Sequence, residues 1–138
     1  MEDQIEIAVG IIIHRNKVLL VKRSHKEKAL DWQFPAGKLE SNEQPFNTAE
    51  REVYEETGVK CKAIKQIGAR RNPLNNVYIH YIVCNYIDGK EFLKDRRENI
   101  DVRWVKIHKI KSYIPNNLYQ GVEVYFQSIN ACTQQLHL

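Results

Sequence analysis

Two apolar runs rich in Val and Ile open the chain, and a short polar stretch separates them. Ile5–Ile13 and Val18–Arg23 each have the composition of a buried strand, and Asn16 lies between them. Asparagine tolerates the left-handed backbone that a tight hairpin turn requires, so His14–Lys17 is predicted to be the turn. The chain therefore begins with a predicted β-hairpin.

A helix is predicted between Pro45 and Gly58. Proline suits the first turn of a helix, where no backbone N–H is needed, and glycine suits the left-handed residue that ends one. Phe46, Ala49 and Val53 recur between them at helical spacing. This narrow apolar stripe is predicted to face the core.

Alternating or apolar segments predict further strands at Trp32–Pro35, Lys60–Arg71, Val77–Ile87 and Val102–Ile107. Polar segments predict a loop at Ser24–Asp31 and a turn at Asn72–Asn76. Apolar residues at helical spacing mark a C-terminal helix: Leu118, Val122, Tyr125, Phe126 and Ile129. Strands dominate and no linker or repeat interrupts the chain, so the prediction is one α/β domain whose sheet is covered by helices.

Composition and charge exclude several classes of protein. The chain has 138 residues, 28% of them charged, and a formal net charge of +4. Its basic residues do not form one block, so nucleic acid is not a predicted partner. No apolar run approaches about 18 residues, so no membrane span is predicted. The first residues, Met1–Asp3, lack the pattern of a signal peptide, and a cytoplasmic location is predicted.

The cysteines carry little information about function. Cys61, Cys84 and Cys132 are an odd number, widely spaced, with no C-x-x-C pair. They predict neither a disulfide framework nor a zinc site. Reduced and mostly buried thiols are expected.

Candidate chemistry gathers in the first predicted helix, where acidic residues recur. At about 100° per residue, Glu52, Glu55 and Glu56 fall within an arc of roughly 100° beside the apolar stripe. Like charges at this spacing destabilise a helix by about 0.2–0.5 kcal/mol per pair, which a bound cation would offset. Oxygen-only ligands suit a hard cation, Mg²⁺ or Mn²⁺ in its place. These residues alone also allow a second interpretation, a solvated acidic face, and Glu50 is predicted to be solvated.

The spacing of this segment resembles the box of the Nudix hydrolase family, G-x5-E-x7-R-E-U-x-E-E-x-G-U, where U is a bulky aliphatic residue. Every fixed position is matched, by Gly37, Glu43, Arg51, Glu52, Val53, Glu55, Glu56, Gly58 and Val59. Similar framework segments lie outside the box, at Ala8-Val9-Gly10, Phe34-Pro35-Ala36-Gly37 and Val102-Arg103-Trp104-Val105. The resemblance covers about residues 5 to 130 and implies a mixed β-sheet flanked by helices, an α-β-α sandwich formed by one domain over residues 1–138.

The resemblance also implies roles for individual residues. In MutT-like members of the family, divalent metal is held by positions that match Glu52, Glu55, Glu56 and the backbone carbonyl of Ala36. Many such relatives have glycine where this chain has Ala36. Glu52 also matches the carboxylate considered as the base for the attacking water. Supporting roles are implied for Gly37, Glu43, Arg51 and Gly58.

Positions outside the acidic helix are candidates for the same site. Glu98, six residues before Trp104, resembles a glutamate that ligates metal or acts as a base, and Asp101 is its rival. Arg23 at the end of the second strand resembles a phosphate-binding arginine, and Lys38 is a second candidate for contact with substrate. Each of these residues also has a plainer interpretation as a solvated charge.

The implied activity is Mg²⁺-dependent hydrolysis of a nucleoside diphosphate linked to a moiety X, with a nucleoside triphosphate as the expected small-molecule substrate. Trp32-Gln33-Phe34-Pro35 also resembles enzymes that act on RNA 5′-ends, which leaves that activity as an alternative. A non-catalytic Nudix domain that senses a nucleotide is another, although such domains often lose box glutamates and this chain keeps all of them. Relatives frequently dimerise, so a homodimer is also open.

Overall fold

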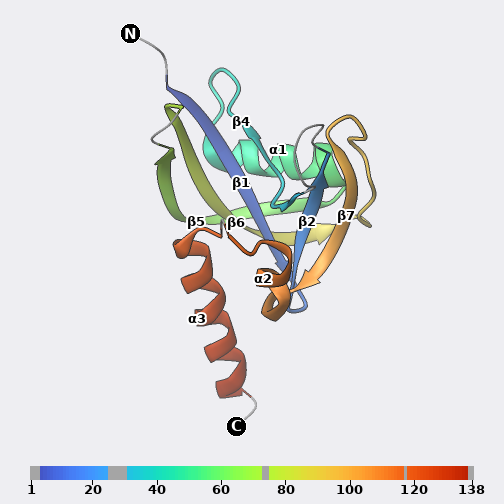
Figure 1. Cartoon of the computed structure of the whole chain (residues 1–138), viewed down its shortest axis with the longest axis vertical. Coiled ribbons are helices and arrows are strands. Elements are labelled where there is room, and N and C mark those ends of the chain that lie inside the picture. The colour runs from blue at the N-terminus through green and yellow to red at the C-terminus, as the bar shows by residue number, and fades with distance from the viewer. Residues whose placement is uncertain (1–3, 25–30, 73–74, 117, 137–138) are drawn as a thin grey trace.

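One mixed sheet organises the computed structural model, which describes residues 4–24, 31–72, 75–116 and 118–136 (Figure 1). Its strands are β1 Ile5–His14, β2 Lys17–Arg23, β3 Asp31–Gln33, β4 Ala36–Lys38, β5 Lys60–Asn72, β6 Val77–Asp88 and β7 Asn99–Lys106. The helices are α1 Pro45–Thr57, α2 Ile110–Tyr113, which a 3-10 turn at Ile107–Lys109 precedes, and α3 Gln120–Leu136. None of the helices in the described part of the chain is long and apolar enough to cross a membrane.

Strand β1 is the axis of the sheet. It runs parallel to β6 along Ile5–Ile13, and β5 adds to the far edge of β6 in the antiparallel sense. The other edge of β1 is shared, because β4 pairs with Ile7–Val9 and β2 pairs with its last residues. Strands β3 and β7 both pair with β2. This topology brings β4, which directly precedes the acidic helix, against the middle of the sheet.

The hairpin between β1 and β2 agrees with its prediction. Arg15 and Asn16 both have positive φ, 50° and 64°, as the central residues of a tight two-residue hairpin turn require. The pairs Ile13–Val18 and His14–Lys17 close the ladder on either side. The polar stretch between the two apolar runs is therefore the turn.

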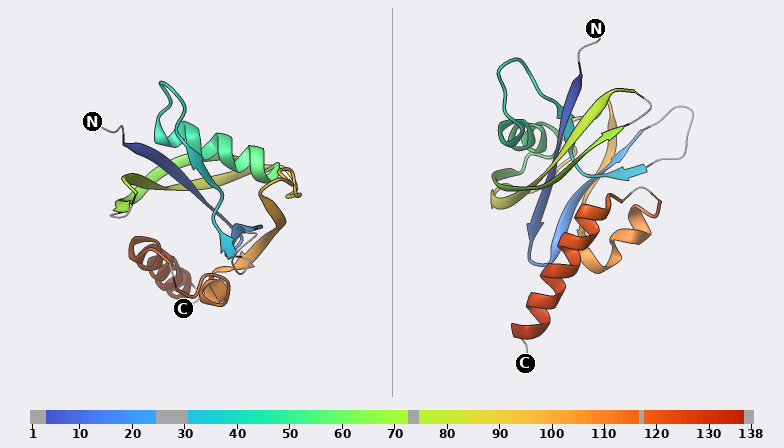
Figure 2. Two further views of the ribbon diagram at one scale, coloured as in Figure 1. Left: turned by 45° about the horizontal axis from the view of Figure 1, so that its top comes forward. Right: turned by 90° about the vertical axis from the view of Figure 1, so that its left-hand side faces the viewer.

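Helices cover both faces of the sheet, α1 on one and α2 with α3 on the other (Figure 2). Alternation along β1 divides the core accordingly: Ala8 and Ile12 pack with α1, whereas Val9 and Ile11 pack with α3. Gly10 allows the close approach of α1, because a Cβ there would lie 2.5 Å from Cγ2 of Val53. The predicted α-β-α arrangement is confirmed.

Helix α1 spans Pro45–Thr57 as predicted, but one residue of its predicted core stripe is wrong. Ala49 and Val53 are fully buried, whereas Phe46 is 38% exposed. In the first turn the buried position belongs to Thr48, whose hydroxyl donates to the Glu43 carboxylate at 2.7 Å. A polar partner therefore replaces the expected aromatic contact.

Other element boundaries differ where the pattern was short or charged. Strand β3 ends at Gln33 rather than at Pro35, because proline offers no N–H to a ladder, and the separate short strand β4 was not predicted. Strand β7 starts at Asn99, three residues before the predicted start, and ends at Lys106. Helix α2 was not predicted either.

Some predictions fall partly outside the described residues. These are the loop Ser24–Asp31, of which residues 25–30 are not described, and the turn Asn72–Asn76, of which residues 73 and 74 are not described. Cys61 and Cys84 are buried free thiols, as predicted. The side chain of Cys132 lies outside the described part of the chain.

Candidate active site

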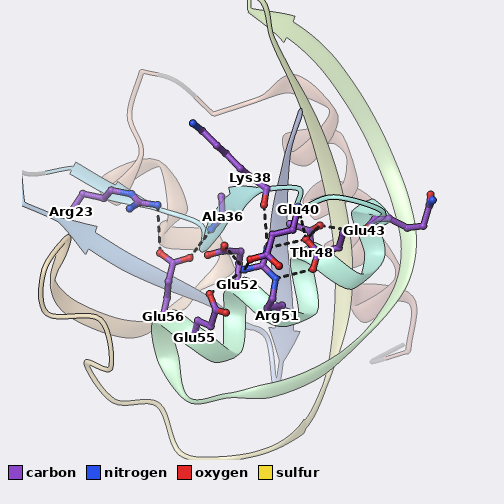
Figure 3. Close-up of polar contacts among 11 residues, drawn as sticks. Arg23, Ala36, Lys38, Glu40, Glu43, Thr48, Arg51, Glu52, Glu55 and Glu56 are labelled. Carbon is purple, nitrogen blue, oxygen red and sulfur yellow. Dashed lines mark hydrogen bonds and ion pairs between the residues drawn. The ribbon is translucent and has the colours of Figure 1, made fainter. Parts of the chain in front are cut away.

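The last two turns of α1 present three carboxylates beside β4 (Figure 3). The helix ends where Gly58 adopts a left-handed φ of 77° and donates its N–H to the Tyr54 carbonyl at 2.9 Å. Glu52, Glu55 and Glu56 therefore lie close to the helix terminus. They differ in burial: Glu56 is 3% exposed, Glu52 is half-buried and Glu55 is exposed.

Glu52 lies directly on the backbone of β4. A Cβ placed on Gly37 would be 2.1 Å from Cδ of Glu52 and 2.2 Å from Oε1, so any larger residue would displace the carboxylate. Burial against the strand raises the pKa of Glu52, and Arg51 acts in the opposite direction. The glycine that opens the box is thus required by a close approach of strand and side chain.

Three donors from three different elements converge on Glu56. The backbone N–H of Ala36 donates to Oε2 at 2.9 Å, while Nη2 of Arg23 at 3.4 Å and Nδ2 of Asn99 at 3.3 Å approach Oε1. Desolvation by burial nevertheless raises the pKa of Glu56 to about 7, although Arg23 and Asn99 lower it. A carboxylate in this environment favours a further positive charge.

Arg51 connects the box residues to one another. Its Nε and Nη2 donate to the two oxygens of Glu43, both at 2.8 Å, and Nη2 also donates to the Lys38 carbonyl at 3.1 Å. Its Nη1 donates to Glu52 at 2.9 Å and to Glu55 at 3.1 Å. One guanidinium therefore holds the loop before α1 and two of the three carboxylates.

Glu43 is the most strongly held partner of Arg51. It also accepts hydrogen bonds from the Thr48 hydroxyl at 2.7 Å and the Glu40 backbone N–H at 2.9 Å. The bond from Arg51, the largest influence, lowers the pKa of Glu43 to about 2, and Glu43 in turn raises the pKa of Arg51. Glu43 therefore stays ionised at pH values where an ordinary glutamate takes up a proton.

Arg23 and Glu98 meet beside Glu56, as the prediction that both belong to one site requires. Nη1 of Arg23 lies 3.0 Å from Oε2 of Glu98, and Nε donates to Gln33 at 3.1 Å. The Glu98 side chain is 67% exposed. Asp101, the rival candidate, pairs instead with Arg103 at 3.0 Å and accepts a bond from a backbone N–H.

Lys38 and Ala36 contribute to this network through their backbones. The Lys38 side chain is exposed and points away from the three carboxylates, while its carbonyl faces Arg51 (Figure 3). The N–H of Ala36 holds Glu56. The predicted roles of the Lys38 ammonium and the Ala36 carbonyl remain predictions.

Several residues of the site were missed by sequence reasoning. Thr48, Gln33 and Asn99 each hold a charged group of the site, but an isolated threonine, glutamine or asparagine has no signature without its tertiary partner. The prediction that Glu50 is solvated was wrong. Its carboxylate accepts the backbone N–H of Ala63 at 2.8 Å, next to a register irregularity in β5.

The donor set fits a hard divalent cation. Among the residues that the structure describes, no three His, Cys, Asp or Glu side chains already surround a common point; Arg51 pairs with Glu52 and Glu55, and Arg23 pairs with Glu56. All the available ligands are oxygens, however, and Oδ1 of Asn99, beside Glu56, is buried without a hydrogen-bond partner in the described part of the chain. Oxygen ligands with excess negative charge suit Mg²⁺ or Mn²⁺.

Comparison with known proteins agrees with the geometry. The sequence model of the NUDIX domain matches residues 5–125. The chain belongs to the Nudix hydrolase family. Its resemblance to the family, its α/β fold and its class as a hydrolase of phosphoric anhydrides are thereby confirmed.

Two curated Nudix relatives and one solved structure illustrate the similarity. An 8-oxo-dGTP diphosphatase of Buchnera aphidicola is 27% identical over 108 residues, 78% of this chain and 81% of that protein. An ADP-ribose pyrophosphatase of Bacillus subtilis is 29% identical over 136 residues, 96% of this chain and 71% of that protein. A Nudix hydrolase of Nitrosomonas europaea has a TM-score of 0.81 at 23% identity, over 92% of this chain and 72% of that one. Some other relatives are longer, and the chain spans less than two thirds of their length.

Proposed function

We propose that this Nudix protein is a Mg²⁺-dependent pyrophosphohydrolase that cleaves a nucleoside diphosphate linked to a moiety X, with a nucleoside triphosphate as the favoured substrate. One observation carries the proposal: Glu52 lies against Gly37, with Glu55 and Glu56 on the same face of α1. A half-buried carboxylate beside two others suits water activation next to a cation-bound phosphate.

The residues that would hold Mg²⁺, or Mn²⁺ in its place, are Glu52, Glu55, Glu56 and the carbonyl of Ala36. When bound, the metal neutralises phosphate oxygens and lowers the pKa of a coordinated water. Arg51 already bonds Glu52 and Glu55, so it holds both side chains on one side of the helix. The Ala36 N–H and the Asn99 side-chain amide each donate a hydrogen bond to Glu56 and hold its carboxylate in place.

In the proposed reaction a water oxygen bonds to one phosphorus while the bridging P–O bond breaks, and the bridging oxygen leaves with its electron pair. The proton of the water goes to Glu52 or to Glu98, the two candidate bases. Nη1 of Arg23 lies 3.0 Å from Oε2 of Glu98, so this guanidinium lies beside one of the two candidate bases. From there Arg23 would bind the phosphate being attacked. Its guanidinium would stabilise charge that develops on the phosphate oxygens.

The choice of a nucleoside triphosphate draws on relatives of similar length. The 8-oxo-dGTP diphosphatase of Buchnera aphidicola is matched over 81% of its length, and a putative 8-oxo-dGTP diphosphatase of Bacillus subtilis is 28% identical over 113 residues. Both names describe nucleoside triphosphate substrates. The nucleobase of the substrate is recognised by loops and strands outside the box, and the fold does not specify which nucleobase is bound.

A hydrolysis screen tests the proposal. The protein is assayed with Mg²⁺ against nucleoside triphosphates, nucleotide sugars, ADP-ribose, dinucleoside polyphosphates and 5′-triphosphate RNA, and products are separated by ion-exchange chromatography. We expect a nucleoside triphosphate to have the highest kcat/KM and to yield pyrophosphate and the monophosphate. Glu52→Gln, assayed in parallel, identifies turnover by a contaminant.

The other outcomes of this screen identify the alternatives. A higher kcat/KM for 5′-triphosphate RNA would favour an enzyme of RNA ends, the class of a Bartonella henselae RNA pyrophosphohydrolase that is 38% identical over 61 residues. A lack of turnover on every substrate, together with nucleotide binding by calorimetry, would favour a non-catalytic sensor. Either result would overturn the proposed activity.

A further inference from the structure

One of the side-chain donors to Glu56 comes from Asn99, a residue that the sequence did not indicate as a candidate. Nδ2 of Asn99 approaches Oε1 of Glu56 at 3.3 Å. Arg23, the other side-chain donor, is divided among Glu56, Glu98 and Gln33. If Arg23 turns to a phosphate, Asn99 and the Ala36 N–H remain as the groups that hold Glu56.

An irregularity in strand pairing turns Asn99 towards Glu56. Strand β7 pairs with β2 so that Asp101 lies opposite Lys22, but Asn99 rather than Ile100 lies opposite Arg23. Residues that face each other across an antiparallel pair point to the same side of the sheet. The extra residue at this bulge therefore puts Asn99 on the side of Arg23 and α1, and leaves Ile100 44% exposed.

Burial of the Asn99 side chain lowers the stability of the folded protein. The residue is 1% exposed, and its Oδ1 has no hydrogen-bond partner among the described residues. A buried acceptor without a partner destabilises a folded protein, and an apolar side chain of similar volume would avoid that cost. The bond from Nδ2 to Glu56 gives a reason for the amide.

The segment that precedes Asn99 is fastened to the end of α1. The Phe92 N–H donates to the Thr57 carbonyl at 3.0 Å, and the Phe92 ring covers Gly58 so closely that a Cβ there would lie 2.2 Å from Cε1. Nζ of Lys94 lies 3.6 Å from the centre of the Tyr54 ring. The chain therefore enters β7 at a fixed position relative to the helix that carries Glu56.

We infer that Asn99 is a positioning residue that orients the Glu56 carboxylate for a divalent cation. The inference rests on the proposed function, since it assumes that Glu56 is a metal ligand. Asn99 donates through Nδ2 to Oε1, and the bond fixes the rotation of the carboxylate. Hydrogen bonds of this kind to metal-ligating groups typically account for about 10–100-fold in metal affinity.

The test is Mn²⁺ binding without substrate. Titration calorimetry of the wild type and Asn99→Leu, each freed of metal with a chelator, measures the dissociation constant directly. We expect Asn99→Leu to bind Mn²⁺ about tenfold more weakly. Its Tm without metal shows whether the variant is folded, because the change removes both the unpartnered oxygen and the bond to Glu56. In Mg²⁺-dependent assays kcat should fall more than KM rises.

Asn85→Leu is the matched control, because Asn85 is an exposed asparagine on β6. This variant should bind Mn²⁺ like the wild type. Where Asn99→Leu fails to fold, Asn99→Ser replaces it and should show the same loss, since its hydroxyl is too short to reach Glu56. Wild-type affinity in the folded Asn99 variant would overturn the inference alone. A wild type that binds no Mn²⁺ would overturn the proposed metal-dependent function and this inference with it.

Discussion

The α-carbon of Gly37 lies against the carboxylate of Glu52, so that a Cβ on Gly37 would be 2.1 Å from Cδ of Glu52. The first residue of the box thus contacts the carboxylate that is the leading candidate for catalysis. Strand β4 and helix α1 carry the two residues, and β4 is held by pairing with β1. The distance between strand and helix therefore determines where the carboxylate lies.

Gly37→Ala is expected to lower kcat strongly and stability little. The added methyl group meets the far end of a side chain that can rotate, so we expect Tm to fall by less than about 5 °C. The displaced Glu52 carboxylate should lower kcat about 100-fold, the scale of a 1 Å misplacement. Steady-state kinetics and thermal unfolding measure the two effects, and an unchanged kcat would contradict the contact with a catalytic carboxylate.

Glu52→Gln should reduce kcat by about two orders of magnitude or more without unfolding the protein. Glutamine has nearly the same shape and its amide oxygen still accepts a bond from Arg51, but it neither binds metal as an anion nor takes a proton. Circular dichroism should match the wild type. Glu55→Gln provides the comparison at a more exposed box position. Near-normal turnover by Glu52→Gln would remove Glu52 from the mechanism.

Arg51→Lys should destabilise the protein by about 1–3 kcal/mol, because lysine cannot reproduce the two parallel bonds to Glu43. Urea denaturation measures the change in unfolding free energy. The double variant with Glu43→Gln should lose less than the sum of the two single changes, since both remove the same interaction. Strict additivity in this cycle would show that the pair is not coupled.

Glu43 should make stability depend on pH in the acidic range. Its pKa in the folded protein is about 2, below the ordinary value of 4.5, so its contribution is complete above about pH 5 and is lost as pH falls toward 2. The Glu43→Gln variant lacks this pH-dependent contribution to stability. The stability difference between wild type and variant should be about 1–3 kcal/mol at pH 6 and should shrink steadily in urea titrations at pH 5, 4 and 3. A pH-independent difference would contradict the depressed pKa.

Gly58→Ala should cost about 1–3 kcal/mol, since alanine at a φ of 77° is strained and its methyl group would overlap the Phe92 ring. Removing the ring in Phe92→Ala/Gly58→Ala should recover part of that loss, leaving mainly the strain at the helix terminus. Thermal unfolding of the two single variants and the double variant gives the coupling. If the stability loss of the double variant equals the sum of the losses of the two single variants, the Phe92 ring moves aside freely in Gly58→Ala.

Local pattern was sufficient for α1 and its carboxylates. Pro45, Gly58 and the spacing between them predict the helix, because caps and a period of 3.6 residues are local properties of the chain. The same spacing places Glu52, Glu55 and Glu56 on one face. Pattern failed for Phe46, because Thr48 rather than Phe46 takes the buried position in the first turn of the helix.

Only the tertiary structure decided which groups meet these carboxylates. Asn99 reaches Glu56 because a one-residue bulge in β7 reverses the side of the sheet to which the chain points, and alternation in sequence does not reveal such a shift. Arg23 reaches both Glu56 and Glu98 because β2 ends beside the helix terminus. The sequence by itself determined the acidic helix and the family, since both depend on spacing along the chain. Strand register and packing, which depend on distant segments, decided how each carboxylate is held.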